Sequence, residues 1–168
     1  MTRRSKATAL CLALCVSATL ALSSCMADTR GLVFVPLNGE GWARTDTLTY
    51  TIEPMGGVTE AGISVLLHTD KYEYGNIAFD ITIEQDSALL YHEQHDYLLE
   101  NCQPKRGIGY RNDYTLPVGN VTLCDTLPTI VTLTQQLNHP HLTGIREVGI
   151  RVAAPMSKPG EPVWKANW

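Results

Sequence analysis

Histidine and cysteine supply the side chains in this sequence that could bind a metal ion or attack a substrate. Four of the five histidines occur in two clusters, HEQH (92–95) and HPH (139–141). Two histidines three residues apart share one face of a helix, but on a strand they point to opposite faces. The surrounding residues favour a strand or loop, and the His-Glu-x-x-His spacing of zinc proteases is absent. We therefore expect exposed histidines here and no metal site.

Other patterns that support catalysis are missing as well. The sequence has no Gly-x-Ser-x-Gly elbow, and Cys102 and Cys124 do not form a Cys-x-x-Cys pair. The segment RGIGYRN (106–112) lacks the third glycine and the following helix of a phosphate-binding loop, so it is better interpreted as a tight turn. Asp80 and Glu84 alternate on the outward face of a predicted strand. The sequence thus predicts neither an enzyme nor a cofactor.

Cys25 has a distinct chemical setting. Three basic residues among the first six precede an apolar stretch from 7 to 22, which is the order of a secretory signal. The stretch is shorter than the roughly 20 residues that span a bilayer. It ends in LSSC (22–25), typical of a bacterial lipobox, in which the cysteine thiol is alkylated by diacylglycerol and the chain is cut before it. We predict a cleaved signal peptide over 1–24 and lipidation at Cys25.

Two alternatives remain for this segment, a retained membrane helix and a buried N-terminal helix. The second needs polar residues at helical intervals on one face, whereas only Ser17 and Thr19 interrupt the apolar run after Thr8 near its start. A lipidated chain would be held on the cell membrane or the outer membrane by its acyl groups. The residues after Cys25, MADT (26–29), contain no acidic cluster of the kind that marks surface export. We therefore expect a position facing the periplasm.

The length, charge and cysteine content of the mature chain limit the kinds of protein that it can be. Removing residues 1–24 leaves 144 of the 168 residues, with ten basic and 17 acidic side chains and a net charge of −7. This length suits one domain, and the acidic balance disfavours a nucleic-acid ligand, which needs a basic face. Cys102 and Cys124 remain as an even pair in an exported chain, where they could form a disulfide. The alternative is two unrelated thiols.

Most of the chain has the alternation of strands. Leu48, Tyr50 and Ile52 alternate with threonines in 45–53, and 63–69 and 76–84 repeat the pattern. KYEYG (71–75) between the last two has turn residues, so we predict a hairpin that joins them. Further strands are expected at 31–36, 88–93, 110–116, 120–124, 129–136 and 145–153, with a loop or short helix near 92–101.

These elements predict an all-β domain. Eight or nine strands without an amphipathic helix favour an antiparallel β-sandwich over 31–153, jelly-roll-like or immunoglobulin-like. A lipidated linker (25–30) would precede it. A tail (154–168) with three prolines, Trp164 and Trp168 would follow.

Several phrases, in the same order, resemble the gliding motility lipoprotein family (GldH) of Bacteroidetes. They are the lipobox ending at Cys25, Trp42 followed by DTLTYTIE (46–53), LLHTDKYEYGNIAFDITI (66–83), GIGYRNDYTLPVG (107–119) and LTGIREVGIRV (142–152). The resemblance covers roughly 20–153. It implies a membrane-anchored lipoprotein without catalytic residues, a component or accessory of the gliding machinery, which is tied to type IX protein secretion. Its partners would be other envelope proteins of that machinery.

The candidate site is the polar loop between the two predicted hairpin strands. Its residues are His68, Asp70, Tyr72, Tyr74 and Asn76. Beside the resemblance, this loop with the neighbouring outer strand face is the possible partner-binding surface. The alternative is that the loop is only a well-made turn. The two tyrosines beside His68 and Asp70 could instead form a platform for a sugar, which makes a glycan-binding lipoprotein the alternative function.

Overall fold

A computed structural model describes residues 29–156 apart from 55, 57, 107–110 and 125. The predicted signal peptide, Cys25, Trp164 and Trp168 lie outside the described residues. The elements are β1 (Thr29–Pro36), β2 (Trp42–Ala43), β3 (Thr47–Ile52), β4 (Val58–Asp70), β5 (Asn76–Gln85), β6 (Ala88–Leu98), the 3₁₀ turn η1 (Leu99–Asn101), β7 (Lys105–Arg106), β8 (Arg111–Cys124), β9 (Thr129–Gln135), β10 (His141–Leu142) and β11 (Ile145–Ala153).

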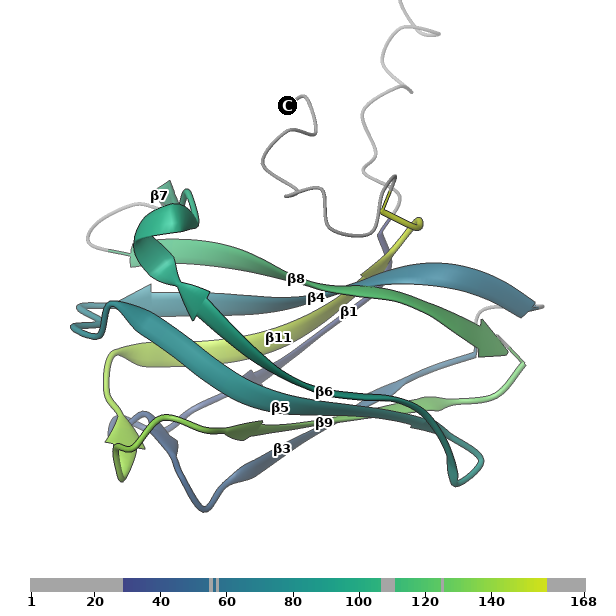
Figure 1. The fold of residues 1–168 in the computed structure, drawn as a ribbon, viewed down its shortest axis with the longest axis horizontal. Helices are drawn as coiled ribbons and strands as arrows, with labels where there is room; N and C mark the ends of the chain where they lie inside the picture. The colour runs from purple at the N-terminus through teal and green to yellow at the C-terminus, as the bar shows by residue number, and fades with distance from the viewer. Residues whose placement is uncertain (1–28, 55, 57, 107–110, 125, 157–168) are drawn as a thin grey trace, which may run out of the picture.

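The strands form two large antiparallel sheets that face each other (Figure 1). The five-stranded sheet has the order β1-β11-β4-β8-β7, and the four-stranded sheet has the order β3-β9-β5-β6. The short strands β2 and β10 pair separately. The predicted all-β class with antiparallel sheets is confirmed.

The core lies between the two sheets because one side of each strand is apolar. In β3 the burial alternates residue by residue, with Leu48, Tyr50 and Ile52 inward and the threonines outward. Buried β-branched and aromatic side chains on both inner faces supply the main stabilising burial. The Tyr50 hydroxyl crosses the core and donates to the carbonyl of Val148 in the other sheet at 3.0 Å. Its pKa is raised by burial, so it remains a neutral donor.

The predicted hairpin of 63–69 with 76–84 is wrong. β4 pairs with β11 and β8, whereas β5 pairs with β6 and β9, so the two strands lie in different sheets. Both show the same inward alternation because they face one core from opposite sides. Residues 71–75 therefore cross from one sheet to the other, a separation of about 10 Å between packed sheets.

Two other local predictions need correction. The strands expected separately at 110–116 and 120–124 are parts of the one continuous strand β8, where a register shift opposite Ile63 and Ser64 leaves Val118 unpaired. A proline is tolerated in a strand at such a bulge. The expected loop or short helix near 92–101 is strand as far as Leu98, followed by η1.

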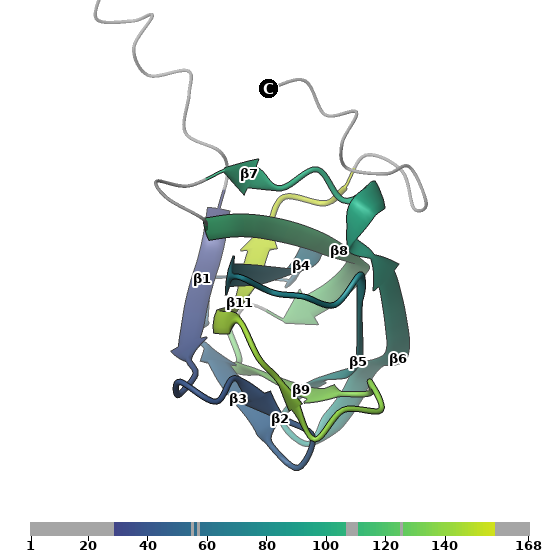
Figure 2. The same ribbon diagram turned by 90° about the vertical axis from the view of Figure 1, so that its left-hand side faces the viewer.

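The sandwich has two ends, which we call proximal and distal. β1 begins and β11 ends at the proximal end, where Thr29 pairs with Ala153. The β5–β6 turn also lies there, with Asp86 and Ser87 both at positive φ (46° and 63°), as a two-residue type I′ hairpin requires. The distal end carries the β1–β3, β4–β5, β6–β8 and β9–β11 connections, and Figure 2 views the molecule from this end.

Candidate functional site

The β4–β5 loop holds two of the predicted aromatic residues close together at the distal end. The Tyr72 and Tyr74 rings meet edge to face with centroids 5.2 Å apart. The Tyr72 hydroxyl donates to the carbonyl of Asn76 at 2.9 Å. Burial, with smaller effects of Tyr74 and Tyr114, raises the pKa of Tyr72, so this donor stays neutral. The Asn76 amide in turn donates to Asp96 Oδ1 at 3.3 Å.

The turn before β11 fixes the path of this loop. Gly144 has a φ of +84°, and a Cβ there would lie 2.8 Å from Lys71 O and from Tyr72 Cα. Only glycine combines this backbone conformation with so close an approach. The Asp70 N–H donates to the carbonyl of Gly144 at 2.7 Å, and the Arg146 guanidinium donates to Asp70 Oδ2 at 3.0 Å. Asp70 therefore positions the loop.

Tyr74 also contacts the connection between β9 and β10. Its ring lies 4.6 Å from the His139 ring, centroid to centroid, and its hydroxyl donates to the carbonyl of His141 at 3.5 Å. An open hollow of about 390 Å³ lies beside this connection. It is lined by Ala43, Arg44, Thr45, Asn138, Pro140 and His141. We call Tyr72, Tyr74, Arg44, His139 and His141 the distal surface.

A second hollow of about 400 Å³ lies on the other side of Tyr74. It is lined by Tyr74, Gly75, Leu99, Glu100, Cys102, Gln103, Pro104 and Tyr114. Burial raises the pKa of the Cys102 thiol, which favours the protonated form. The half-exposed Tyr74 thus lines this second hollow and contacts His141, which lines the first.

The suggested Cys102–Cys124 disulfide is absent from this structure. Cys102 follows β6 at the distal end, whereas Cys124 pairs with Val58 at the proximal end of β8. The two are therefore separated by most of the length of β8. Cys124 Sγ lies 3.0 Å from Thr126 Oγ1, and Cys102 Sγ lies 3.6 Å from the carbonyl of Leu98.

His68 belongs to a different surface. It lies on the outer face of the five-stranded sheet, where its Nδ1 is 2.9 Å from Glu147 Oε2 and its Nε2 is 3.9 Å from Asp113 Oδ1. Its ring contacts Phe34, with centroids 4.6 Å apart. Of the five predicted loop residues, the structure brings Tyr72, Tyr74 and Asn76 together, gives Asp70 a positioning contact, and places His68 among strand neighbours.

The HEQH histidines lie on opposite faces of β6, as expected for a strand. His92 is exposed on the outer face, as expected, but His95 faces inward with Tyr91, Glu93 and Tyr97, so the expectation of exposed histidines is wrong for His95. The His95 ring nitrogens lie 3.0 Å from the Tyr91 hydroxyl and 3.2 Å from the Tyr97 hydroxyl. Burial lowers the pKa of His95 more than the nearby Glu93 raises it. Within residues 29–156 as described, no three His, Cys, Asp or Glu side chains are placed to hold a metal ion.

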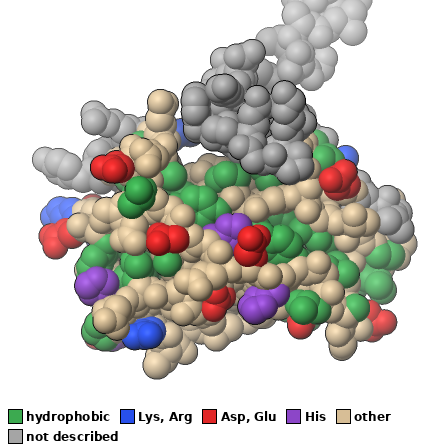
Figure 3. All heavy atoms as spheres, in the orientation of Figure 1, with side chains coloured by type: hydrophobic (Ala, Val, Ile, Leu, Met, Phe, Trp, Pro, Cys, Tyr) green, Lys and Arg blue, Asp and Glu red, His purple; other side chains and the backbone are tan. Residues whose placement is uncertain are grey.

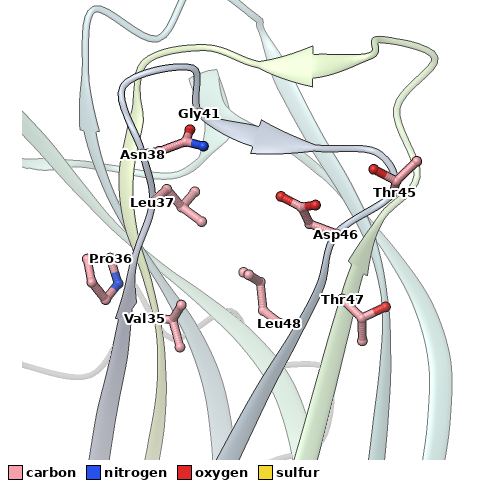
Figure 4. A pocket seen from close by; sticks show the side chains of 9 residues that line it. All are labelled: Val35, Pro36, Leu37, Asn38, Gly41, Thr45, Asp46, Thr47 and Leu48. Carbon is pink, nitrogen blue, oxygen red and sulfur yellow. The ribbon is translucent and has the colours of Figure 1, made fainter.

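A third hollow, of about 400 Å³, opens between β1 and β3. Figure 4 shows Leu37 and Asn38 on one side and Asp46 and Leu48 on the other, directed toward one another. The Trp42 indole N–H donates to the carbonyl of Asp46 at 3.3 Å, so a buried side chain supports this wall. The hollow is therefore lined by the carboxylate of Asp46, the amide of Asn38 and the aliphatic side chains of Leu37 and Leu48.

The sequence reasoning missed the part of the distal surface that comes from outside the β4–β5 loop. Arg44, whose guanidinium donates to Asn138 Oδ1 at 3.0 Å, and the HPH histidines come from two other connections. HPH stands out in the sequence as a turn-rich cluster. Its position beside Tyr74 depends on the sheet order.

Comparison with known proteins gives the family. The sequence profile of the GldH lipoprotein family matches residues 33–152. No protein with a curated description matches the chain. Among solved structures, the fold is similar to dimeric latent PorU from Porphyromonas gingivalis, at 8% identity and a TM-score of 0.35, over 80% of this chain and 14% of that one. It is also similar to Eiger TNF from S. frugiperda, at 11% identity and a TM-score of 0.28, over 81% of this chain and 94% of that one.

The family match covers the core strands from β1 to β11, including the β4–β5 loop. Membership implies attachment to a membrane by lipid. No helix among the described residues is long and apolar enough to cross a membrane. The chain belongs to the GldH lipoprotein family and is a lipoprotein associated with gliding motility.

Proposed function

We propose that this protein is a non-enzymatic component or accessory of the gliding motility and type IX secretion machinery, and that it acts through protein–protein contacts at the distal surface. The observation that carries the proposal is the family match over residues 33–152. The protein would be anchored through Cys25 on the cell or outer membrane and would face the periplasm.

The position of the anchor supports the choice of surface. Thr29 begins β1 at the proximal end, and the predicted lipid site is four residues earlier in the chain. The distal surface lies at the other end of the strands, so a membrane held at the proximal end leaves it uncovered. Tyr74, which lines one hollow and contacts His141 at the edge of another, offers the kind of half-exposed aromatic anchor that often dominates a protein interface.

The test is a Tyr74→Ala variant expressed in place of the native protein. We expect reduced spreading and reduced type IX export, with unchanged abundance in the membrane fraction. A Thr49→Ala variant, altered at an exposed threonine on the outer face of β3, is the matched control and should behave as wild type. A gene deletion that leaves both spreading and export normal would rule the proposal out.

We also infer that the sandwich is of jelly-roll type. The eight long strands are numbered one to eight in chain order, which leaves out β2, β7 and β10. With this numbering, the strand order is 1-8-3-6 in one sheet and 2-7-4-5 in the other. This order, with four strands in each sheet, is that of a jelly roll.

A second candidate function, glycan binding, is favoured by the hollow between β1 and β3 (Figure 4). A carboxylate and an amide above aliphatic side chains can hydrogen-bond sugar hydroxyls while the floor contacts the ring carbons. Specific retention on a glycan array that is lost in Asp46→Ala would support it. If Tyr72→Ala or Tyr74→Ala abolishes retention instead, the sugar binds at the distal surface.

A further inference from the structure

The outer edge of β6 is one of the two long unpaired edges among the described strands, the other being the part of β8 beyond its two pairs with β7. β6 has 11 residues and pairs with β5 alone. The other outer strands, β1, β3 and β7, have eight, six and two residues. In Figure 2, β6 forms the right-hand margin of the four-stranded sheet. Proteins usually protect such an edge with proline, lysine, a bulge, an inward-pointing charge or a covering segment. β6 contains neither proline nor lysine, and its protective features are a bulge at Leu90 and the inward Glu93.

Apolar side chains are exposed on this strand. Leu89, Leu90 and Leu98 are 60%, 37% and 54% exposed. They are half of the large apolar residues that are exposed among the described residues, the others being Leu32, Leu127 and Ile130. Leu89 and Leu90 lie at one end of the strand and Leu98 lies at the other, so the edge carries exposed leucine at both ends.

The sequence of β6 is complementary to its own reverse. Residues 90–98 read LYHEQHDYL. When a second copy runs antiparallel and Gln94 lies opposite Gln94, the pairs are Leu90 with Leu98, Tyr91 with Tyr97, His92 with Asp96, and Glu93 with His95. Each carboxylate meets a histidine and each leucine meets a leucine.

We propose that two copies of this protein associate through β6, antiparallel and two-fold symmetric about Gln94, so that their four-stranded sheets join into one continuous sheet. In a two-fold interface residue i contacts residue j and j contacts i, which is the relation that the pairs show. The pairing also respects the faces of the strand. The inward residues Tyr91, Glu93, His95 and Tyr97 pair with one another, and the outward residues do the same.

Other registers fit worse. A two-fold axis at Glu93 places Leu90 opposite Asp96, and one at His95 places His92 opposite Leu98. An axis between two residues sets inward side chains against outward ones, which the pleat forbids. The charges on this face also favour a second copy as the partner. Figure 3 shows His and acidic side chains in the middle of the face that β6 crosses, and Lys and Arg only near its margins. The acidic side chains can therefore pair with the histidines of a second copy. A second copy therefore fits the edge better than an arbitrary strand.

The first test is disulfide trapping of the full-length lipidated protein in its own membrane. In a Cys102→Ser, Cys124→Ser background, Gln94→Cys should give a disulfide-linked dimer under mild oxidation. Directly opposed residues in antiparallel strands have Cα atoms roughly 4.5–5.5 Å apart, which is within disulfide range. The same background without Gln94→Cys should stay monomeric.

His92→Cys in that background is the matched control. In the proposed register His92 is offset by four residues from its own copy, about 13 Å along the strand, which exceeds the roughly 7 Å that a disulfide allows. We expect little dimer from His92→Cys or Asp96→Cys alone, and a mixed dimer when both are co-expressed. The proposal is overturned if Gln94→Cys does not dimerise, if it links to a different protein, or if His92→Cys alone dimerises equally well.

A charge swap provides an independent test. His92→Asp places a new carboxylate opposite Asp96 of the other copy, and the two-fold symmetry repeats this like-charge pair. We expect the dissociation constant of the dimer to rise about tenfold. The double variant His92→Asp, Asp96→His restores an opposite pair and should recover the wild-type constant. Both positions are exposed, and the one bond lost, from the Asn76 amide to Asp96, lies at the surface, so the fold should be retained. A double variant as weak as the single one would overturn the register. Neither test requires motility or export, so both are independent of the proposed function.

Discussion

Gly144 shows how one residue determines the distal surface. Its positive φ and the 2.8 Å approach to Lys71 O let the β10–β11 turn lie directly against the β4–β5 loop. The loop carries Tyr72 and Tyr74, so their placement depends on a glycine about 70 residues away in the sequence. Gly75 lies in the loop itself, yet a Cβ there would meet no atom within 4 Å.

Gly144→Ala should therefore destabilise the protein, by about 2 kcal/mol, because the new methyl group meets backbone and φ is unfavourable for alanine. Gly75→Ala is the control and should change the free energy of unfolding by less than about 0.5 kcal/mol. Denaturant unfolding of the two variants measures both values. Equal effects would show that the close approach at Gly144 is not a constraint.

His95 determines a pH dependence of stability. Its side chain is 14% exposed and lies among Phe79, Tyr91 and Tyr97 with Glu93 nearby. Burial lowers its pKa below the ordinary value of 6.5, so the folded protein favours the neutral ring. As the pH falls below about 6.5, the unfolded chain binds a proton more readily than the folded one. The free energy of unfolding should therefore fall in this range.

We expect His95→Gln to reduce this loss of stability between about pH 7.5 and pH 5.5. His92→Gln, at an exposed position of the same strand, should leave the slope unchanged. Unfolding curves measured across the range give the comparison. A slope that is the same in wild type and His95→Gln would assign the titration to another group.

At the scale of elements, Gln85 joins the two sheets at the proximal end. It ends β5, and its amide donates to Cys124 O at 2.7 Å and to Thr129 Oγ1 at 2.8 Å. Its Oε1 accepts from the Cys124 N–H at 2.8 Å. The side chain is only 5% exposed, so these bonds are made where water does not replace them.

Gln85→Ala should cost about 3 kcal/mol, since it removes the hydrogen bonds that the buried side-chain amide makes to Cys124 and Thr129. Gln103→Ala, at an exposed glutamine, is the control and should be close to neutral. Thermal unfolding would show the difference as a lower midpoint for Gln85→Ala alone. A neutral Gln85→Ala would mean that water replaces the lost bonds.

The elements also show what the sequence can predict. Alternation placed most strands correctly, because a residue such as Tyr50 or Phe79 must face the core whatever its strand pairs with. It could not predict partners, since β4 and β5 have the same alternation on opposite sides of one core. Alternation also could not predict that β8 continues through Pro117, because proline and glycine occur both in bulges and in turns.

Because the sequence does not show which strands are partners, it predicted only part of the candidate site. Tyr72, Tyr74 and Asn76 are local to one loop, so reading the loop was enough to group them. His139 and His141 reach Tyr74 only through the order of strands in two sheets. His68 is two residues from Asp70, but the pleat directs it to the outer face of the five-stranded sheet beside Phe34.

For the whole molecule, the anchor decides where the fold can act. We expect Cys25→Ser to lose labelling by a palmitate analogue and to leave the membrane fraction, because the thiol that carries the lipid is gone. Cys102→Ser, which removes a thiol at the distal end, should keep both label and membrane attachment. Retention of Cys25→Ser in the membrane would refute lipidation at this residue.

The start of β1 at the proximal end has a geometric consequence for the proposed dimer. Antiparallel pairing of β6 sends the two copies in opposite directions, so their lipid tethers would leave from opposite ends of one rigid body. With only three residues between the predicted lipid site at Cys25 and Thr29, such a dimer would rest lengthwise along the bilayer. Its two distal surfaces would then point sideways, in the plane of the membrane and away from each other. A particle with two outward-facing ends in that plane is suited to connect lateral neighbours into rows.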